Sequence, residues 1–168
     1  MEVEKGKIYS FKIKHRAEKE QVLVLVVGID WILGKWLFDY QMDGYVLLSR
    51  KHITSIERGE REEFWEEVLK ANNRFVVDTI NIPLTTDELM NWLLETKTVF
   101  QIEPKDETVC YVGYTMKILK QHIRFKDLSS KGLWDDDYTL HRIQSLMLLK
   151  FDSDYINCLV KYNQSLKQ

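Results

Sequence analysis

The order of apolar and polar residues predicts strands in two groups, each followed by a helix. Residues 7–16 alternate between apolar and polar, which predicts a half-buried strand. Residues 21–29 are almost continuously apolar and β-branched, which predicts a central strand buried on both faces. Over residues 59–72 and from about residue 153 to residue 166, the apolar side chains fall on one helical stripe. Each of these two segments is expected to be an amphipathic helix.

Between the two groups, the pattern predicts one further strand over Phe75–Ile82 and a helix that begins near Thr85. Thr85 and Glu88 have the spacing of a capping box, in which each side chain bonds to the other residue's backbone N–H. Asp43-Gly44 is typical of a two-residue hairpin turn, because both central positions of a type I′ turn need a positive φ. A strand pair broken near Gly34 is expected at residues 31–40, and further strands are expected at residues 45–48, 53–57, 99–103, 108–120, 121–127, 138–141 and 143–149.

The two groups follow the same order of motifs about 90 residues apart, which indicates an internal repeat. Ile53–Leu69 aligns without a gap with Ile143–Leu159. The predicted fold class is α+β, with two related small antiparallel β-barrel-like units, each followed by an amphipathic helix, and a central helix between them. The first unit and its helix are expected over residues 1–74, and the rest of the chain, residues 75–168, forms the second part. No Ser/Gly-rich linker separates the two parts, so they are expected to pack closely.

The first group runs from a strand ending in Gly28, through Asp43-Gly44-Tyr45, to the sequence Ile53-Thr54-Ser55-Ile56. This order resembles the Sm-like and SH3-like small β-barrel domains of uncharacterised bacterial proteins. The likeness is best over Lys7–Glu57 and weaker over Thr108–Leu149. Sm-like barrels usually place their helix before the strands, whereas the helices follow here, so the resemblance concerns architecture and assigns no site. It implies RNA binding and ring assembly, which are common among Sm-like proteins.

Composition excludes some classes of protein and leaves others open. The chain has 168 residues, 45% of them hydrophobic, which is enough for a core without a disulfide or metal. Its 24 Lys and Arg residues against 26 Asp and Glu residues lack the basic surplus of most nucleic-acid binders. No signal-peptide core or membrane-spanning run is present, so a cytoplasmic protein with no membrane contact is expected. Cys110 and Cys158 are then expected to be buried free thiols, and the glutamates around the first helix to be solvated.

No catalytic, metal or cofactor site is predicted, and the chain is not expected to be an enzyme. Carboxylates such as those of Asp135–Asp137 can bind Mg²⁺ or Ca²⁺, but a turn after Gly132 explains this run without a metal. The four histidines lack metal-binding spacing, and neither Ser55 nor Ser145 lies in a nucleophile elbow. A metal-dependent hydrolase that uses Asp135–Asp137 is therefore the third alternative.

The favoured function is non-catalytic binding or assembly, with a protein partner or self-association. Trp31, Trp36 and Tyr45 are the predicted contact residues, because exposed aromatic side chains are enriched at protein interfaces. The alternative is binding of RNA or single-stranded nucleic acid, in which cations hold phosphates and aromatic rings stack on bases. The residues predicted for that alternative are Lys12, Lys14, Arg16, Arg124 and Lys126.

Overall fold

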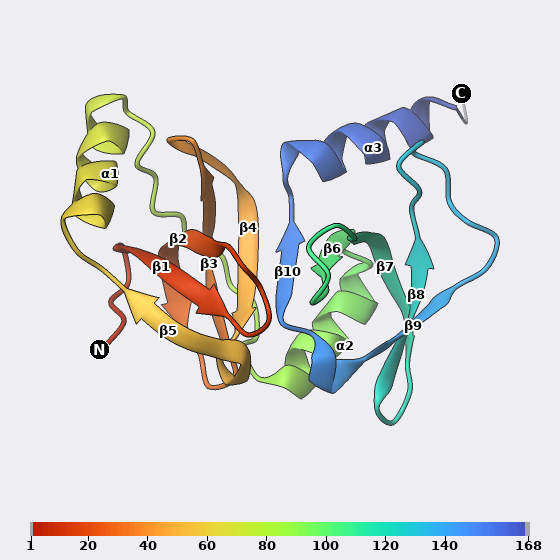
Figure 1. The fold of residues 1–168 in the computed structure, drawn as a ribbon. Helices are drawn as coiled ribbons and strands as arrows, with labels where there is room; N and C mark the ends of the chain where they lie inside the picture. The colour runs from red at the N-terminus through yellow and green to blue at the C-terminus, as the bar shows by residue number, and fades with distance from the viewer. Residues whose placement is uncertain (1, 167–168) are drawn as a thin grey trace.

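The computed structural model describes residues 2–166, and its strands form one antiparallel sheet (Figure 1). The ten strands follow the order β5-β1-β2-β3-β4-β10-β6-β7-β8-β9. They are β1 (Ile8–Ile13), β2 (Lys19–Val27), β3 (Trp31–Phe38), β4 (Gln41–Ser49), β5 (Ile53–Glu57), β6 (Phe100–Glu103), β7 (Tyr111–Ile118), β8 (His122–Asp127), β9 (Thr139–Arg142) and β10 (Leu148–Phe151).

The helices lie where the hydrophobic periodicity predicts them. They are α1 (Glu60–Ala71), α2 (Thr86–Thr96) and α3 (Asp154–Ser165). Two single turns of 3₁₀-helix, η1 (Arg50–His52) and η2 (Ile143–Ser145), precede β5 and β10 respectively. The prediction of a strand buried on both faces is confirmed for Val22–Leu25 of β2, which are all buried, and is wrong for its last two residues, Val26 and Val27, which are exposed.

The predicted fold of two β-barrel-like units is wrong. β4 pairs with β10 from Leu48↔Leu148 to Tyr45↔Phe151, so both halves of the chain share one open, mostly β structure. The sequence could not reveal this pairing, because β4 and β10 are apolar strands that give no sign of which edge they join.

The strand order is nevertheless the same in both halves: β5-β1-β2-β3-β4 and β10-β6-β7-β8-β9. Each half also ends with a 3₁₀ turn, a strand and a 12-residue helix. The alignment of Ile53 with Ile143 is wrong, because Ile53 follows η1 whereas Ile143 begins η2. Leu146, the residue after η2, is the structural counterpart of Ile53.

Asp43-Gly44 is not a hairpin turn. The turn between β3 and β4 lies at Asp39-Tyr40, with φ of 43° and 58°. Gly44 instead lies in a bulge within β4, with φ of 65°. A Cβ atom there would lie 2.6 Å from the carbonyl oxygen of Phe151, so glycine permits the close approach of the connection between β10 and α3.

Helices α2 and α3 both begin against carboxylates of the first half. The backbone N–H of Thr86 donates to Oδ2 of Asp30 at 2.7 Å, and that of Asp154 donates to Oδ1 of Asp43 at 2.7 Å. Both bonds supply an acceptor to a free N–H group at a helix start. The predicted capping box is absent, because the Thr85 hydroxyl donates to the Glu88 carboxylate and makes no backbone bond.

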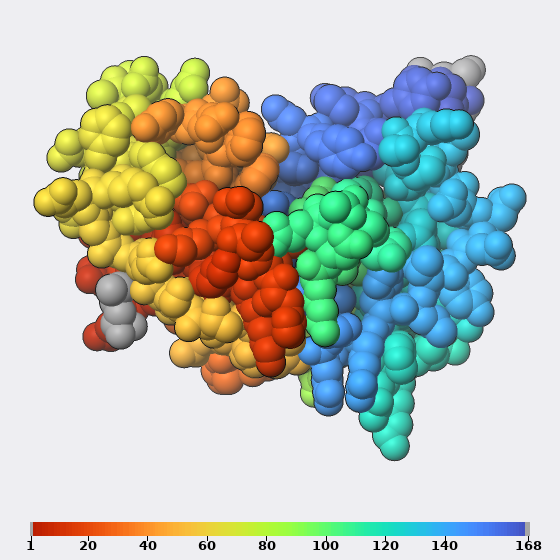
Figure 2. All heavy atoms as spheres, in the orientation of Figure 1, coloured from red at the N-terminus to blue at the C-terminus, as the bar shows by residue number. Residues whose placement is uncertain are grey.

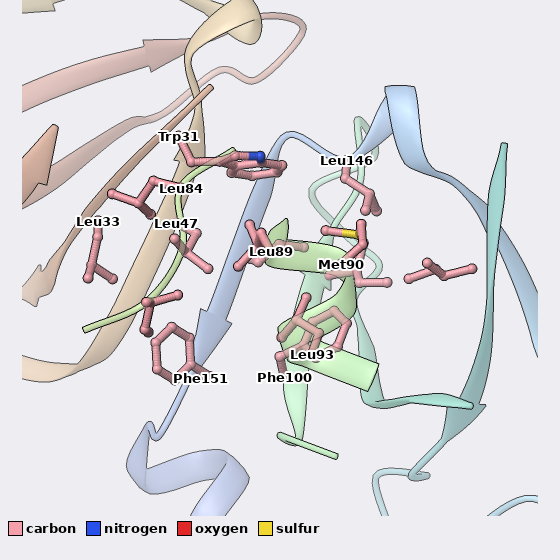
Figure 3. Packing of buried hydrophobic residues seen from close by; sticks show 14 of the residues in the cluster. Trp31, Leu33, Leu47, Leu84, Leu89, Met90, Leu93, Phe100, Leu146 and Phe151 are labelled. Atoms are coloured by element: carbon pink, nitrogen blue, oxygen red, sulfur yellow. The ribbon is translucent and has the colours of Figure 1, made fainter. Parts of the chain in front are cut away.

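The largest hydrophobic cluster joins the two halves around α2. Trp31, Leu33 and Leu47 come from the first half, whereas Phe100 and Phe151 come from the second. Figure 3 shows Trp31, Leu33, Leu47 and Phe151 on one side of Leu89, Met90 and Leu93 of α2, and Phe100 beside Leu93. The continuous cluster predicts that the halves unfold together.

The segment Phe75–Ile82 is not a strand, although its apolar residues are used in packing. The ammonium of Lys35 lies 2.5 Å from Asp78, and the Tyr45 hydroxyl donates to the same carboxylate at 2.8 Å. These contacts hold the segment to the side chains of the sheet, without the backbone pairing that would make it a strand.

The acidic face of α1 is partly buried, contrary to the prediction of a solvated face. The backbone N–H of Ile8 donates to Glu66 at 2.9 Å, and the Ser10 hydroxyl donates to Glu62 at 2.6 Å. Burial by itself would raise the pKa of both carboxyls, but hydrogen bonds and neighbouring arginines outweigh it and lower the pKa of each. The two glutamates therefore fasten α1 to β1.

Replacing Leu149 with alanine should destabilise the whole chain. Leu149 is fully buried in β10, so Leu149→Ala should lower the free energy of unfolding by about 2–5 kcal/mol. Urea unfolding followed by tryptophan fluorescence and circular dichroism should give one coincident transition. The matched control, Leu140→Ala, removes a leucine that is 55% exposed and should change the free energy by about 0.5 kcal/mol or less. Two separate transitions would show that the halves fold independently.

Candidate functional site

Five aromatic side chains gather where the β3–β4 hairpin meets α1, at the upper left of Figure 1. We call this group the aromatic patch; it comprises Trp36, Phe38, Tyr40, Phe64 and Trp65. Phe38 is 60% exposed, Phe64 is 54% exposed and Tyr40 is 41% exposed. Such a concentration of exposed rings on one end of a protein is typical of an interaction surface.

The rings of the aromatic patch form two contact groups, one within β3 and one between the hairpin turn and α1. Trp36 and Phe38 are stacked with centroids 5.7 Å apart. The ring of Tyr40 stands edge-on to Phe64 and to Trp65, each with a centroid separation of 6.4 Å. These contacts position Phe38 against Trp36, and Tyr40 against the rings of α1.

The hairpin turn that carries Tyr40 has an unfavourable backbone. Both turn residues, Asp39 and Tyr40, lie in the left-handed region that type I′ turns reserve chiefly for Asn and Gly. For a residue such as tyrosine, this conformation costs about 1–2 kcal/mol. Strain of this kind is retained chiefly where a side chain has a function. Here the strained turn places an aromatic ring at the surface.

Phe38 separates two hollows of different chemistry. One, of about 320 Å³, is lined mainly by Leu37, Tyr40 and Trp65. The other, of about 410 Å³, adjoins Trp36 and is lined largely by charged residues. The residues of this charged hollow are Arg16, Glu18, Lys19, Glu20, Gln21, Trp36, Leu37, Phe38, Glu107 and Lys150. The first hollow, whose lining also includes Gln21 and Asp39, is mostly uncharged and lies beside a charged one.

The base of the charged hollow is a closed ring of four buried charges, which we call the charge ring. Arg16 pairs with Glu20 and with Glu103, at 3.3 Å in each case. Lys150 pairs with Glu20 at 3.7 Å and with Glu103 at 3.5 Å. All four side chains are at most 10% exposed. Each cation thus has two anions as neighbours, and each anion has two cations.

The charge ring joins the two halves and supports the aromatic patch. Arg16 and Glu20 belong to the first half, whereas Glu103 and Lys150 belong to the second. The ring nitrogen of Trp36 donates to Glu20 at 2.9 Å, and the ammonium of Lys150 lies 3.7 Å from the centroid of the Trp36 ring. Trp36 is therefore fixed from below by a carboxylate and a cation–π contact, and its ring stacks on the exposed ring of Phe38.

The three predicted protein-contact residues have different positions. Trp31 is only 1% exposed and belongs to the core, where its ring nitrogen donates to the Thr86 hydroxyl at 3.2 Å. Tyr45 is half-buried and stacks on Phe151, with the Lys35 ammonium over its ring. Only Trp36 lies at the aromatic patch.

Sequence reasoning missed Phe38, Tyr40 and Phe64. The hairpin turn was predicted at Asp43-Gly44, and residues 31–40 were predicted to be a strand pair broken near Gly34, whereas β3 runs through Gly34 without a break. Phe64 lies on the helical stripe with Trp65 and therefore has the pattern of a core residue. The signal that could have found part of the surface is the alternation of Trp36 and Phe38, which places two rings on one face of β3, with Tyr40 in the turn that follows.

The residues predicted for nucleic-acid binding do not form one surface. Arg16 is buried in the charge ring, and Lys12 donates to the backbone oxygen of Ala17. Arg124 lies over the Tyr138 ring at 4.2 Å, and Lys126 donates to the backbone oxygen of Asp136, both in the second half. Of the five residues predicted to bind nucleic acid, only Lys14 is an exposed side chain that lies near other cations.

Those other cations surround a cavity of about 260 Å³ that is lined by residues of both halves. We call it the seam pocket. Its lining residues are Lys14, His15, His52, Lys105, Arg142, Gln144, Ser145 and Met147. No carboxylate lines this cavity, in contrast to the charged hollow beside Trp36.

The remaining candidates have local structural contacts. Asp135–Asp137 follows a turn in which the Asp135 N–H donates to the backbone of Asp127, and residues 2–166 contain no cluster of His, Cys, Asp or Glu that could hold a metal ion. Cys110 and Cys158 are exposed free thiols, so the prediction that they are buried is wrong.

Comparison of the chain with protein-family models, curated proteins and solved structures finds no match. Within residues 2–166, no helix is long and apolar enough to cross a membrane. The proposals below therefore depend on the geometry and chemistry of the two surfaces.

Neutralising one member of the charge ring should destabilise the protein strongly. Glu103→Gln leaves Arg16 and Lys150 with one carboxylate between them and should cost about 3–5 kcal/mol in urea unfolding. The matched control is Glu57→Gln, which breaks an exposed pair with Lys19 and should cost about 1 kcal/mol or less.

A double-mutant cycle separates the charge ring from ordinary packing. Glu103→Gln combined with Lys150→Met removes one charge of each sign. The double variant should lose less stability than the sum of the two single variants, because neither mutation then leaves an unbalanced buried charge. Additive losses would contradict a cooperative ring.

Proposed function

We propose that this protein is a non-catalytic protein-binding module and that the aromatic patch is its contact surface. The observation that carries the proposal is the exposure of Phe38, Tyr40 and Phe64 on two elements that fix their rings against Trp36 and Trp65. Aromatic side chains bury a large area at a small cost in conformational entropy, because they have few rotatable bonds. Rings that are already positioned lose even less on binding.

The support beneath the aromatic patch favours a preformed binding surface. The charge ring holds Trp36, and the buried carboxylates of Glu62 and Glu66 hold α1 against β1. The hairpin and the helix therefore keep one relative position without the partner. A partner that inserts an apolar side chain beside Leu37 and Trp65, with a charged group beside Lys19 or Glu107, would match the two hollows.

Replacing exposed rings of the aromatic patch should abolish binding without unfolding the protein. The partner is first trapped by placing a photoreactive benzoylphenylalanine at position 38 and irradiating the protein in an extract of its host cells. Isothermal titration of the identified partner with Phe38→Ser/Phe64→Ser should then show a loss of affinity of about 30-fold or more. The melting temperature should change little, because both side chains are largely exposed.

The matched control is Tyr155→Ser/Tyr162→Ser, which removes two exposed rings from α3 in the other half. It should bind the partner as the wild type does. Equal losses of affinity for the two double variants would contradict the assignment. So would a partner that is cross-linked only when the photoreactive residue is placed at position 162 and not at position 38. Light scattering decides whether the partner is a second copy of the chain, since the wild type alone would then be a dimer and the Phe38 variant a monomer.

A further inference from the structure

We propose that the seam pocket binds a small phosphorylated anion. The proposal is independent of the aromatic patch, because it depends on different residues at a different end of the sheet. Its basis is the contrast between the two places where charges of both halves meet. In the charge ring, cations and carboxylates are matched, whereas the seam pocket holds cationic and histidine side chains and no carboxylate.

The cations of the seam pocket have free donors. Within residues 2–166, the side-chain nitrogens of Lys14, Lys105 and Arg142 make no ion pair or hydrogen bond, so their N–H groups are available to a ligand. An arginine guanidinium and two ammonium groups around one cavity match the several acceptor oxygens of a phosphoryl group. Gathering like charges without a counterion is unfavourable, and a bound dianion would remove that repulsion.

The two histidines are held in the wall of the seam pocket by the backbone. His15 has a φ of 68°, a left-handed conformation that is uncommon for a residue other than glycine. The backbone N–H of Lys14 donates to the carbonyl oxygen of His52 at 2.8 Å, which ties the turn between β1 and β2 to η1. The Nε2 atom of His52 lies 3.0 Å from the carbonyl oxygen of Gln144, so it carries the proton and donates across the seam.

The electrostatics of His52 agree with an anion site. Burial lowers the pKa of the His52 imidazole, and the positive charges of Lys51, Lys14 and His15 lower it further, whereas the bond to Gln144 opposes this change. A positive potential therefore exists at the cavity in the absence of ligand. An anion bound there would reverse the effect of the lysines and raise the pKa of His52.

The dimensions favour a small ligand over a nucleic-acid strand. A cavity of about 260 Å³ can hold a phosphoryl group with a small organic substituent. A single strand instead needs a groove with exposed rings for successive bases, and among the residues that line this cavity none is aromatic except the two histidines. Because both halves supply donors, the ligand would also strengthen the contact between them.

The test titrates inorganic phosphate into the wild type at mildly alkaline pH, where phosphate is a dianion, and follows backbone amides and the His52 ring by NMR. Saturable chemical-shift changes should appear at Lys14, His52 and Arg142. A pH titration in saturating phosphate should give a higher pKa for His52 than a pH titration without phosphate. Lys105→Ala/Arg142→Ala should weaken phosphate binding by about tenfold or more. The matched control, Lys117→Ala/Lys120→Ala, removes the same charge from the exposed β7–β8 hairpin and should weaken it by less than about twofold.

Three results would overturn the proposal. The first is the absence of saturable shifts at the seam pocket, and the second is an equal loss of binding in both double variants. The third comes from parallel titrations with adenosine monophosphate and with a short single-stranded RNA. If RNA binds the same residues far more tightly than the mononucleotide, the ligand is a nucleic acid and not a small phosphorylated molecule.

Discussion

The structure depends on the pairing of β4 with β10, because this contact converts two five-strand groups into one sheet. Where they meet, both strands are mostly apolar and nearly all of their residues are buried, so neither could stand as an exposed edge without a large loss of hydrophobic burial. The pairing also brings Gly44 against the start of α3 and Asp43 within reach of its first N–H groups. In Figure 2 the two halves accordingly meet along a broad front, and the segment around residues 104–107 lies against the turn that follows β1.

The polar contacts of the seam set how the halves are aligned, whereas the hydrophobic cluster supplies most of the stabilisation. Burying four charges carries a large desolvation cost, and a closed ring of alternating signs recovers it only in one geometry. Pairing β4 and β10 one residue out of register would turn Lys150 to the opposite face, away from Glu20 and Trp36 of the first half. The charge ring thus destabilises shifted registers of β4 and β10 more than it stabilises the correct one.

The periodicity of nearby residues predicted most helices and strands, but contacts between residues distant in the chain could not be predicted from the sequence. The periodicities of β2, α1 and α3 depend on residues close in the chain, and the structure has these elements where they were expected. Arg16 was predicted to be a surface cation because its partner Glu103 is distant in the sequence. Asp43 was predicted to be a turn residue and Asp30 was given no role, although both cap helices of the other half. For the candidate site the same division holds: Trp36 was predicted as a contact residue, but the clustering of Phe64 with Tyr40 needs the packing of α1 on the sheet.

The turn after β1 connects the two proposed sites physically. Lys14 and His15 line the seam pocket, and the next residue, Arg16, belongs to the charge ring that supports Trp36. Coupling between the sites would require this turn to have two arrangements of similar free energy. The described contacts oppose that, since Arg16 is buried between two carboxylates and the backbone of Lys14 is bonded to His52. Moving Arg16 out of this position would leave the buried carboxylates of Glu20 and Glu103 with one cation fewer, which is unfavourable. The turn therefore has one arrangement, and each site should bind its ligand independently of the other.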